Sequence, residues 1–340
     1  MINIAEHLER FYPYFDGEIE QSVAAAAAAQ DNLSFRELAT QYGVDNGPQS
    51  VRPYGDRRVM EYYQLVPKAD YDETAARVCY ASMATPADKS MAMRAIRLFA
   101  ADPSAPLLVV GNPGAVGRRA NRLRPIDAAR VWRGQLGPAV SLSLQHLQNT
   151  GVKRAEFIGY SYGAELAASA CAESCDFGID ARSGVWMEPV SMIDRGLISL
   201  ASDFIDSGAA LPEYVAASDS AALDEARASA DTGLSRYVFG VLRLSNVAIA
   251  HALSRDGFSV RARLALDTQA RFRATTVWGD ASELSQPNRL KALGNELSVT
   301  YGRRYGALIM KGMKHAGGDD INLHAAMVLQ ASRRNTTALA

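Results

Sequence analysis

The stretch Ala155–Ala170, AEFIGYSYGAELAASA, decides the fold. It begins with the apolar run Phe157–Gly159 and passes through Tyr160–Gly163 into an alanine-rich segment. This pattern predicts a short buried strand, a tight turn and a helix. The turn fits Gly-x-Ser-x-Gly, in which the glycines let strand and helix approach while the backbone of Ser161 adopts strained angles. Its hydroxyl would then project from the corner, close to helix amide groups that favour negative charge.

A strand, this turn and a helix near mid-chain resemble the nucleophile elbow of the α/β-hydrolase superfamily. The resemblance implies a mostly parallel central sheet flanked by helices, with Ser161 as the nucleophile. It also implies that an acid and then a histidine follow the serine along the chain. The alternative for the motif alone is a glycine-rich turn with a solvated serine.

Composition and charge are those of an ordinary globular protein with one large core. The chain has 340 residues, of which 48% are hydrophobic and 21% charged, and its net charge is −1. Nothing in this balance indicates binding to nucleic acid or to an anionic membrane, and no apolar run is long enough for a membrane span. The N-terminal residues show no secretory leader, so we expect a cytoplasmic protein.

The three cysteines, Cys79, Cys171 and Cys175, predict neither a disulfide framework nor a zinc site. Cys171 and Cys175 are one helical turn apart after the elbow, and we interpret them as small buried thiols. We expect no cofactor.

The patterns divide the chain into four segments. Residues 1–52 are expected to form a helical arm, residues 53–189 the first part of the hydrolase core, residues 190–266 a helical cap, and residues 267–340 the rest of the core. Within the cap segment, helices are expected at residues 193–204, 221–230 and 237–253. The cap is either extra helical packing or a substrate cover over the strand ends.

The arm carries an aromatic-rich helical face formed by Leu8, Phe11, Tyr12 and Phe15. The run Gly43–Pro53 separates it from the first expected strand. Because such a face needs a partner, the arm either covers the core or docks a second copy of the chain or another protein.

Apolar segments that alternate with helical ones predict a parallel sheet with helices on both faces. Besides the strand before Ser161, strands are expected at residues 57–66, 76–82, 107–110, 181–189, 273–278 and 307–310. A helical stretch at residues 126–150 is expected to break near Gly137-Pro138.

His315 is the candidate base. It lies on the loop between the last expected strand and the last helix, which is where the superfamily carries its histidine. The rival His324 falls inside the closing helix, and His146 lies on a helix before the elbow. His7 and His251 do not fit the order of the triad.

Three carboxylates could orient that histidine, a role that requires accepting the imidazole N–H. Glu283 and Asp280 follow the strand that ends at Trp278-Gly279, the usual position in the superfamily. Ser282 stands where many relatives carry the aspartate. Glu188, at the end of the strand after the elbow, is where some relatives place the acid. We rank Glu283 first, Asp280 second and Glu188 third.

An oxyanion hole needs two N–H donors. The resemblance assigns one to the backbone of Tyr162 and the other to Met83, on the loop after the third strand. Relatives usually have His-Gly where this chain has Ser82-Met83, and the glycine-rich run Gly111–Gly117 is a rival loop. That run lacks Gly-Lys-Ser/Thr and so does not predict a phosphate site.

Together these features predict a serine hydrolase that cleaves an ester-like or other acyl bond of a small molecule. The alternative is a protein that keeps the fold but has lost catalysis, and that acts as a binding or structural component.

Overall fold

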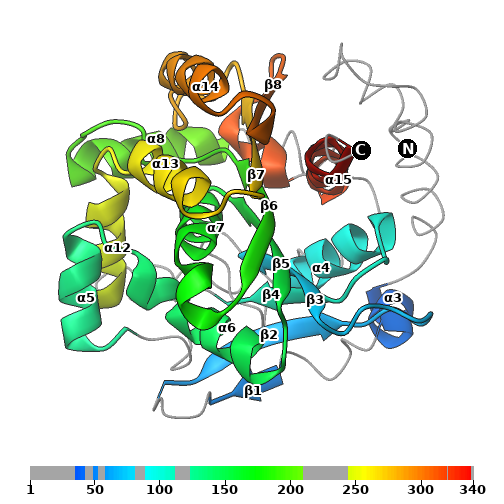
Figure 1. Ribbon diagram of the computed structural model, residues 1–340. Helices are drawn as coiled ribbons and strands as arrows, with labels where there is room; N and C mark the ends of the chain where they lie inside the picture. Colours follow the sequence, from blue (N-terminus) through cyan, green and yellow to red (C-terminus); the bar gives the residue numbers. More distant parts are fainter. Residues whose placement is uncertain are drawn as a thin grey trace.

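The structure is a computed structural model that describes residues 35–42, 49–52, 58–80, 89–111, 123–209, 244–319 and 321–337. At its centre these residues form an eight-stranded sheet of order β1-β2-β4-β3-β5-β6-β7-β8 (Figure 1). The strands are β1 (Gln49–Val51), β2 (Met60–Leu65), β3 (Ala75–Tyr80), β4 (Leu107–Val110), β5 (Arg154–Tyr160), β6 (Asp180–Met187), β7 (Arg273–Gly279) and β8 (Tyr305–Met310). Strands β3 to β8 run parallel, and β1 and β2 are antiparallel at one edge.

Helices cover both faces of the sheet, as Figure 1 shows. The described helices are α3 (Phe35–Tyr42), α4 (Lys89–Ala101), α5 (Pro125–Trp132), α6 (Gly137–Asn149), α7 (Tyr162–Glu173), α8 (Leu197–Ala209), α12 (Leu244–Leu253), α13 (Phe258–Thr268), α14 (Pro287–Tyr301) and α15 (Ile321–Thr337). On β5, Phe157 packs in the core on the α6 and α7 side, while its neighbour Ile158 packs in the core beneath α4 and α15. Both side chains are fully buried because successive residues of a strand point to opposite faces. The predicted parallel sheet with helices on both faces is confirmed.

The segment expected to be an arm contributes to the core at its C-terminal end. β1 pairs with β2, although the sequence predicts a run that breaks secondary structure at residues 43–53. A three-residue edge strand is too short to produce a periodic pattern. In α3, the ring of Tyr42 packs edge-on against Phe99 of α4, with 5.9 Å between centroids. The aromatic face at residues 8–15 lies outside the described residues, so its docking role stays a prediction.

The segment expected to be a cap, residues 190–266, contains α8, α12 and α13, and its expected helix at residues 221–230 lies outside the described residues. α13 packs along α7 in the layer that covers the sheet, and Arg261 of α13 pairs with the buried Glu165 of α7. α12 packs against α5, where Trp132 and His251 stack with 3.8 Å between ring centroids. The described part of the segment therefore supplies helical packing, and its role as a substrate cover stays a prediction.

Cys79 and Cys171 are buried and Cys175 is exposed, and all three thiols are free. The interpretation of Cys175 as a buried thiol on the elbow helix is wrong. α7 ends at Glu173, and Cys175 lies in a following 3-10 turn at the surface, Ser174–Phe177. Among the described helices, none combines the length and apolarity needed to cross a membrane.

Candidate active site

Ser161 occupies the corner between β5 and α7, because the strand ends at Tyr160 and the helix begins at Tyr162. Its backbone has φ 57° and ψ −123°, a conformation that residues with a side chain rarely adopt. Such strain persists only where the surrounding structure holds it, and it concentrates at functional sites.

The glycine at 159 makes this corner possible. A Cβ atom placed on Gly159 would lie 1.9 Å from the carbonyl oxygen of Gly163, so any side chain there would separate strand from helix. The close approach is therefore the physical reason for the glycine that the sequence motif predicts.

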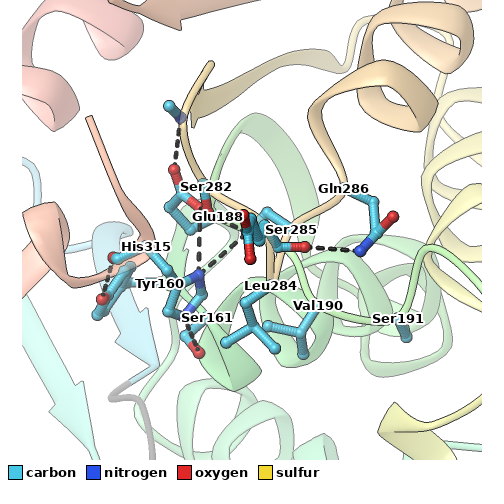
Figure 2. Close-up of polar contacts among 12 residues, drawn as sticks. Tyr160, Ser161, Glu188, Val190, Ser191, Ser282, Leu284, Ser285, Gln286 and His315 are labelled. Carbon is cyan, nitrogen blue, oxygen red and sulfur yellow. Dashed lines mark hydrogen bonds and ion pairs between the residues drawn. The ribbon is translucent and has the colours of Figure 1, made fainter. Parts of the chain in front are cut away.

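His315 lies in the 3-10 turn His315–Asp319 that follows β8, and its side chain is buried. Its Nε2 atom is 2.9 Å from the Oγ atom of Ser161 (Figure 2). Tyr160 holds the histidine in two ways: its hydroxyl donates to the His315 carbonyl oxygen at 2.6 Å, and its ring stacks on the imidazole with 5.4 Å between centroids. Tyr160, the residue directly before Ser161, thus holds the imidazole of His315 beside the serine hydroxyl.

The carboxylate beside His315 belongs to Glu188, which the sequence ranking placed third. Its Oε2 atom is 3.1 Å from Nδ1 of His315, and the side chain is fully buried. Glu188 directly follows β6 and, like Ser161, has a positive φ, of 51°. Glu283 and Asp280, which the sequence ranking placed first and second, do not occupy this position. Glu283 is exposed, and Asp280 is exposed and accepts a hydrogen bond from the Gly312 amide at 2.5 Å.

Donors surround the Glu188 carboxylate, which satisfies its charge inside the protein. Oε1 accepts from the Gly279 amide at 2.5 Å, and Oε2 accepts from the hydroxyls of Ser282 and Ser285. The Ser285 hydroxyl is also 3.0 Å from Nδ1 of His315, so it bridges base and carboxylate (Figure 2). Sequence reasoning missed Ser285. The available signal was the Ser282–Ser285 spacing directly after the Gly279 strand end.

The rival histidines are placed elsewhere. His324 is buried in α15, where desolvation lowers its pKa to about 3, and its Nδ1 donates to the Gly318 carbonyl at 3.2 Å. Burial also lowers the pKa of His146, whose ring packs against Tyr62. His251 stacks on Trp132, and His7 lies outside the described residues.

Of the two predicted oxyanion donors, Tyr162 lies within the described residues. The amide of Tyr162 is the first of α7 and directly follows Ser161 in the chain. This is the position that the resemblance assigns to an oxyanion donor, and the role itself stays a prediction. Met83 and residues 112–117 of the rival glycine-rich run lie outside the described residues, so the second donor stays a prediction.

Helix α8 of the inserted segment reaches this site. The ring of Phe204 meets the imidazole of His315 edge to face, with 6.4 Å between centroids and 88° between planes. An apolar side chain thus lies against the histidine on a segment inserted between β6 and β7. Among the described residues, no group of three or more His, Cys, Asp or Glu side chains is arranged to hold a metal ion.

Comparison with solved structures identifies the fold. The chain is similar to an esterase from Pyrococcus furiosus, with 10% identity, a TM-score of 0.54 and coverage of 89% of this chain and 94% of that one. It is also similar to an enol-lactonase from Burkholderia xenovorans, with 14% identity, a TM-score of 0.51 and coverage of 83% of this chain and 98% of that one. A third similar structure is a proline iminopeptidase from Mycobacterium smegmatis, with 13% identity, a TM-score of 0.50 and coverage of 86% of this chain and 99% of that one. No protein-family model matches the chain, and no curated protein matches its sequence. These likenesses show that the chain has the α/β-hydrolase fold.

Proposed function

We propose that this protein is a serine hydrolase that cleaves an ester-like or other acyl bond through Ser161, His315 and Glu188. The observation that carries the proposal is the hydrogen-bonded chain from Ser161 Oγ through the imidazole to Glu188 Oε2, with links of 2.9 Å and 3.1 Å. It begins at a strained elbow and ends at a fully buried carboxylate. The proposed base, His315, is thus within hydrogen-bond reach of both the proposed nucleophile and the proposed acid.

The proposed mechanism requires one particular tautomer of His315. In this mechanism the carboxylate of Glu188 accepts the N–H of Nδ1, and Nε2 of His315 takes the proton of Ser161. The serine oxygen then attacks the acyl carbon, and the amide of Tyr162 stabilises the developing oxyanion. The imidazolium gives its proton to the leaving group, and a water molecule repeats the sequence on the acyl-enzyme.

The structural neighbours support a hydrolase without selecting a substrate. An esterase, an enol-lactonase and a peptidase share this fold. Because one fold hosts many chemistries, the proposal rests on the site and the neighbours add only the reaction class. The substrate is expected to be a small acyl compound, with Phe204 as part of its apolar cover.

Reaction with a fluorophosphonate tests the proposal directly. An activated serine attacks the phosphorus, displaces fluoride and keeps a covalent adduct, so mass spectrometry of digested protein should locate the adduct on Ser161. A panel of p-nitrophenyl esters of increasing chain length should then show turnover and an optimum length. A folded protein that takes up no label and hydrolyses no ester of the panel would contradict a serine hydrolase and favour a binding or structural role.

The two serines that donate to Glu188 should differ in effect. Ser285→Ala removes a hydroxyl shared by Glu188 and Nδ1 of His315, whereas Ser282→Ala removes one that contacts the carboxylate alone. We expect kcat to fall about tenfold for Ser285→Ala, equivalent to one buried hydrogen bond of roughly 1.4 kcal/mol, and less for Ser282→Ala. Steady-state kinetics on both variants, with thermal melts as a folding control, measure this. The reverse order would remove Ser285 from the base–acid bridge.

A further inference from the structure

Arg195 lies on the connection between β6 and α8, and its side chain is only 4% exposed. One of its terminal nitrogens, Nη2, donates to the carbonyl oxygens of Val190 and Leu284, each at 3.0 Å. The other, Nη1, forms an ion pair of 2.6 Å with Asp203 of α8. A single guanidinium therefore binds three separate segments of the chain.

Each of these segments carries one part of the proposed site. Val190 is two residues after Glu188, and Leu284 immediately precedes Ser285; Figure 2 labels them on the two loops beside the acid. Asp203 immediately precedes Phe204, whose ring contacts His315. Arg195 thus links the acid, the bridging hydroxyl and the helix that covers the histidine.

The loop after Glu188 is held from its other side as well. The Oε1 atom of Glu165 accepts from the amides of Val190 at 3.1 Å and Ser191 at 2.9 Å, and Glu165 is itself paired with Arg261. Both the N–H and the carbonyl of Val190 are therefore bound to buried charged groups. Glu188 has a positive φ, and strained backbone of this kind persists only where its surroundings hold it.

We propose that Arg195 is a positioning residue of the active site, and that it couples the placement of helix α8 over His315 to the placement of Glu188 and Ser285. This inference rests on the proposed function. The planar guanidinium can bind two carbonyls and a carboxylate at once, whereas a lysine ammonium is a single point charge on a flexible stem. Loss of the fork frees the two loops that set the distance from His315 to its acid, and a displacement of about 1 Å can cost roughly 100-fold in rate.

Four variants test this role: Arg195→Met, Arg195→Lys, Asp203→Asn, and Arg263→Met as a matched control. Arg263 also pairs with a carboxylate of another segment, that of Glu296. This ion pair is exposed and joins α13 to α14. For each variant the fluorophosphonate labelling rate, kcat and KM for a p-nitrophenyl ester, and the melting temperature are measured.

Arg195→Met should lower the labelling rate and kcat about 10- to 100-fold, and Arg195→Lys should fall between it and the wild type. Asp203→Asn keeps both carbonyl contacts and loosens only α8, so it should raise KM severalfold while kcat stays within about twofold. This division between kcat and KM separates positioning from a merely structural role. A merely structural role would lower the melting temperature of the variants without dividing their effects between kcat and KM. Arg263→Met should match the wild type in all four measurements.

Arg195 variants that stay folded and keep the wild-type labelling rate and kcat would overturn the proposal. If Arg195→Met does not fold, Arg195→Lys tests whether Arg195 positions the two loops. Asp203→Asn tests whether it positions α8, and an unchanged KM in that variant would overturn the coupling. A wild-type protein that is not labelled at Ser161 would overturn the proposed function, and the positioning role with it. A labelled wild type with unaffected Arg195 variants would overturn the positioning role alone.

Discussion

Replacing Ser161 by alanine is expected to abolish acyl-bond hydrolysis and fluorophosphonate labelling while the protein stays folded. The hydroxyl is the only part of the residue that the proposed reaction uses, and its oxygen is the atom 2.9 Å from Nε2 of His315. Removing it leaves substrate binding and the oxyanion donors, so turnover should drop by a factor of roughly 10³ or more. Ester hydrolysis by purified protein, with circular dichroism to verify folding, measures the loss.

The chain offers a matched control for this substitution. Ser169 lies on α7, the helix that begins directly after Ser161; it is also buried, and its hydroxyl has no hydrogen-bond partner among the described residues. Ser169→Ala should therefore keep the labelling rate and turnover of the wild type. If Ser161→Ala retains more than about a tenth of wild-type turnover, the serine is not the nucleophile and the proposed mechanism fails.

The sheet could be predicted because its strands are buried on both faces. Buried parallel strands are continuous apolar runs, and the expected strand at residues 107–110 has the bounds of β4. The predicted break in the helical stretch at 126–150 also appears, since α5 ends at Trp132 and α6 starts at Gly137 with Pro138 in its first turn. β1 could not be predicted, because its three residues are partly exposed at the sheet edge and obtain their order from pairing with β2.

The site residues also fall into those that a sequence pattern predicts and one that depends on the packing of the fold. The position of Ser161 follows from a local pattern, and that of His315 follows from chain order once the pattern is interpreted as an elbow. The acid depends on packing between elements: β6 and β7 are adjacent parallel strands, so Glu188 and Glu283 both follow strand ends at the same edge of the sheet. What separates them is burial, and no local pattern around either residue indicates which carboxylate turns inward.

Replacing Glu188 by glutamine is expected to lower turnover on the order of 10³-fold, much more than the same change at Glu283. Every oxygen of the Glu188 carboxylate faces donors: Oε1 faces the Gly279 amide, and Oε2 faces two hydroxyls and Nδ1 of His315. A glutamine has one acceptor oxygen and one NH₂ group, so its nitrogen must face a donor in either orientation. With nitrogen toward His315, the imidazole changes tautomer and Nε2 no longer accepts the serine proton. With nitrogen toward Gly279, the end of β7 is pushed away.

Glu283→Gln and Asp280→Asn are the matched comparisons, because they make the same chemical change on the loop after β7. Glu283 is exposed, so its loss should change kcat by less than about twofold. Asp280 accepts from the Gly312 amide on the loop that leads to His315, and Asp280→Asn should therefore cost more than Glu283→Gln but far less than Glu188→Gln. Steady-state kinetics and labelling rates on the three single variants give the order. A loss at Glu283 that exceeds the loss at Glu188 would mean that the buried carboxylate supports the fold and that another group orients His315 during the reaction.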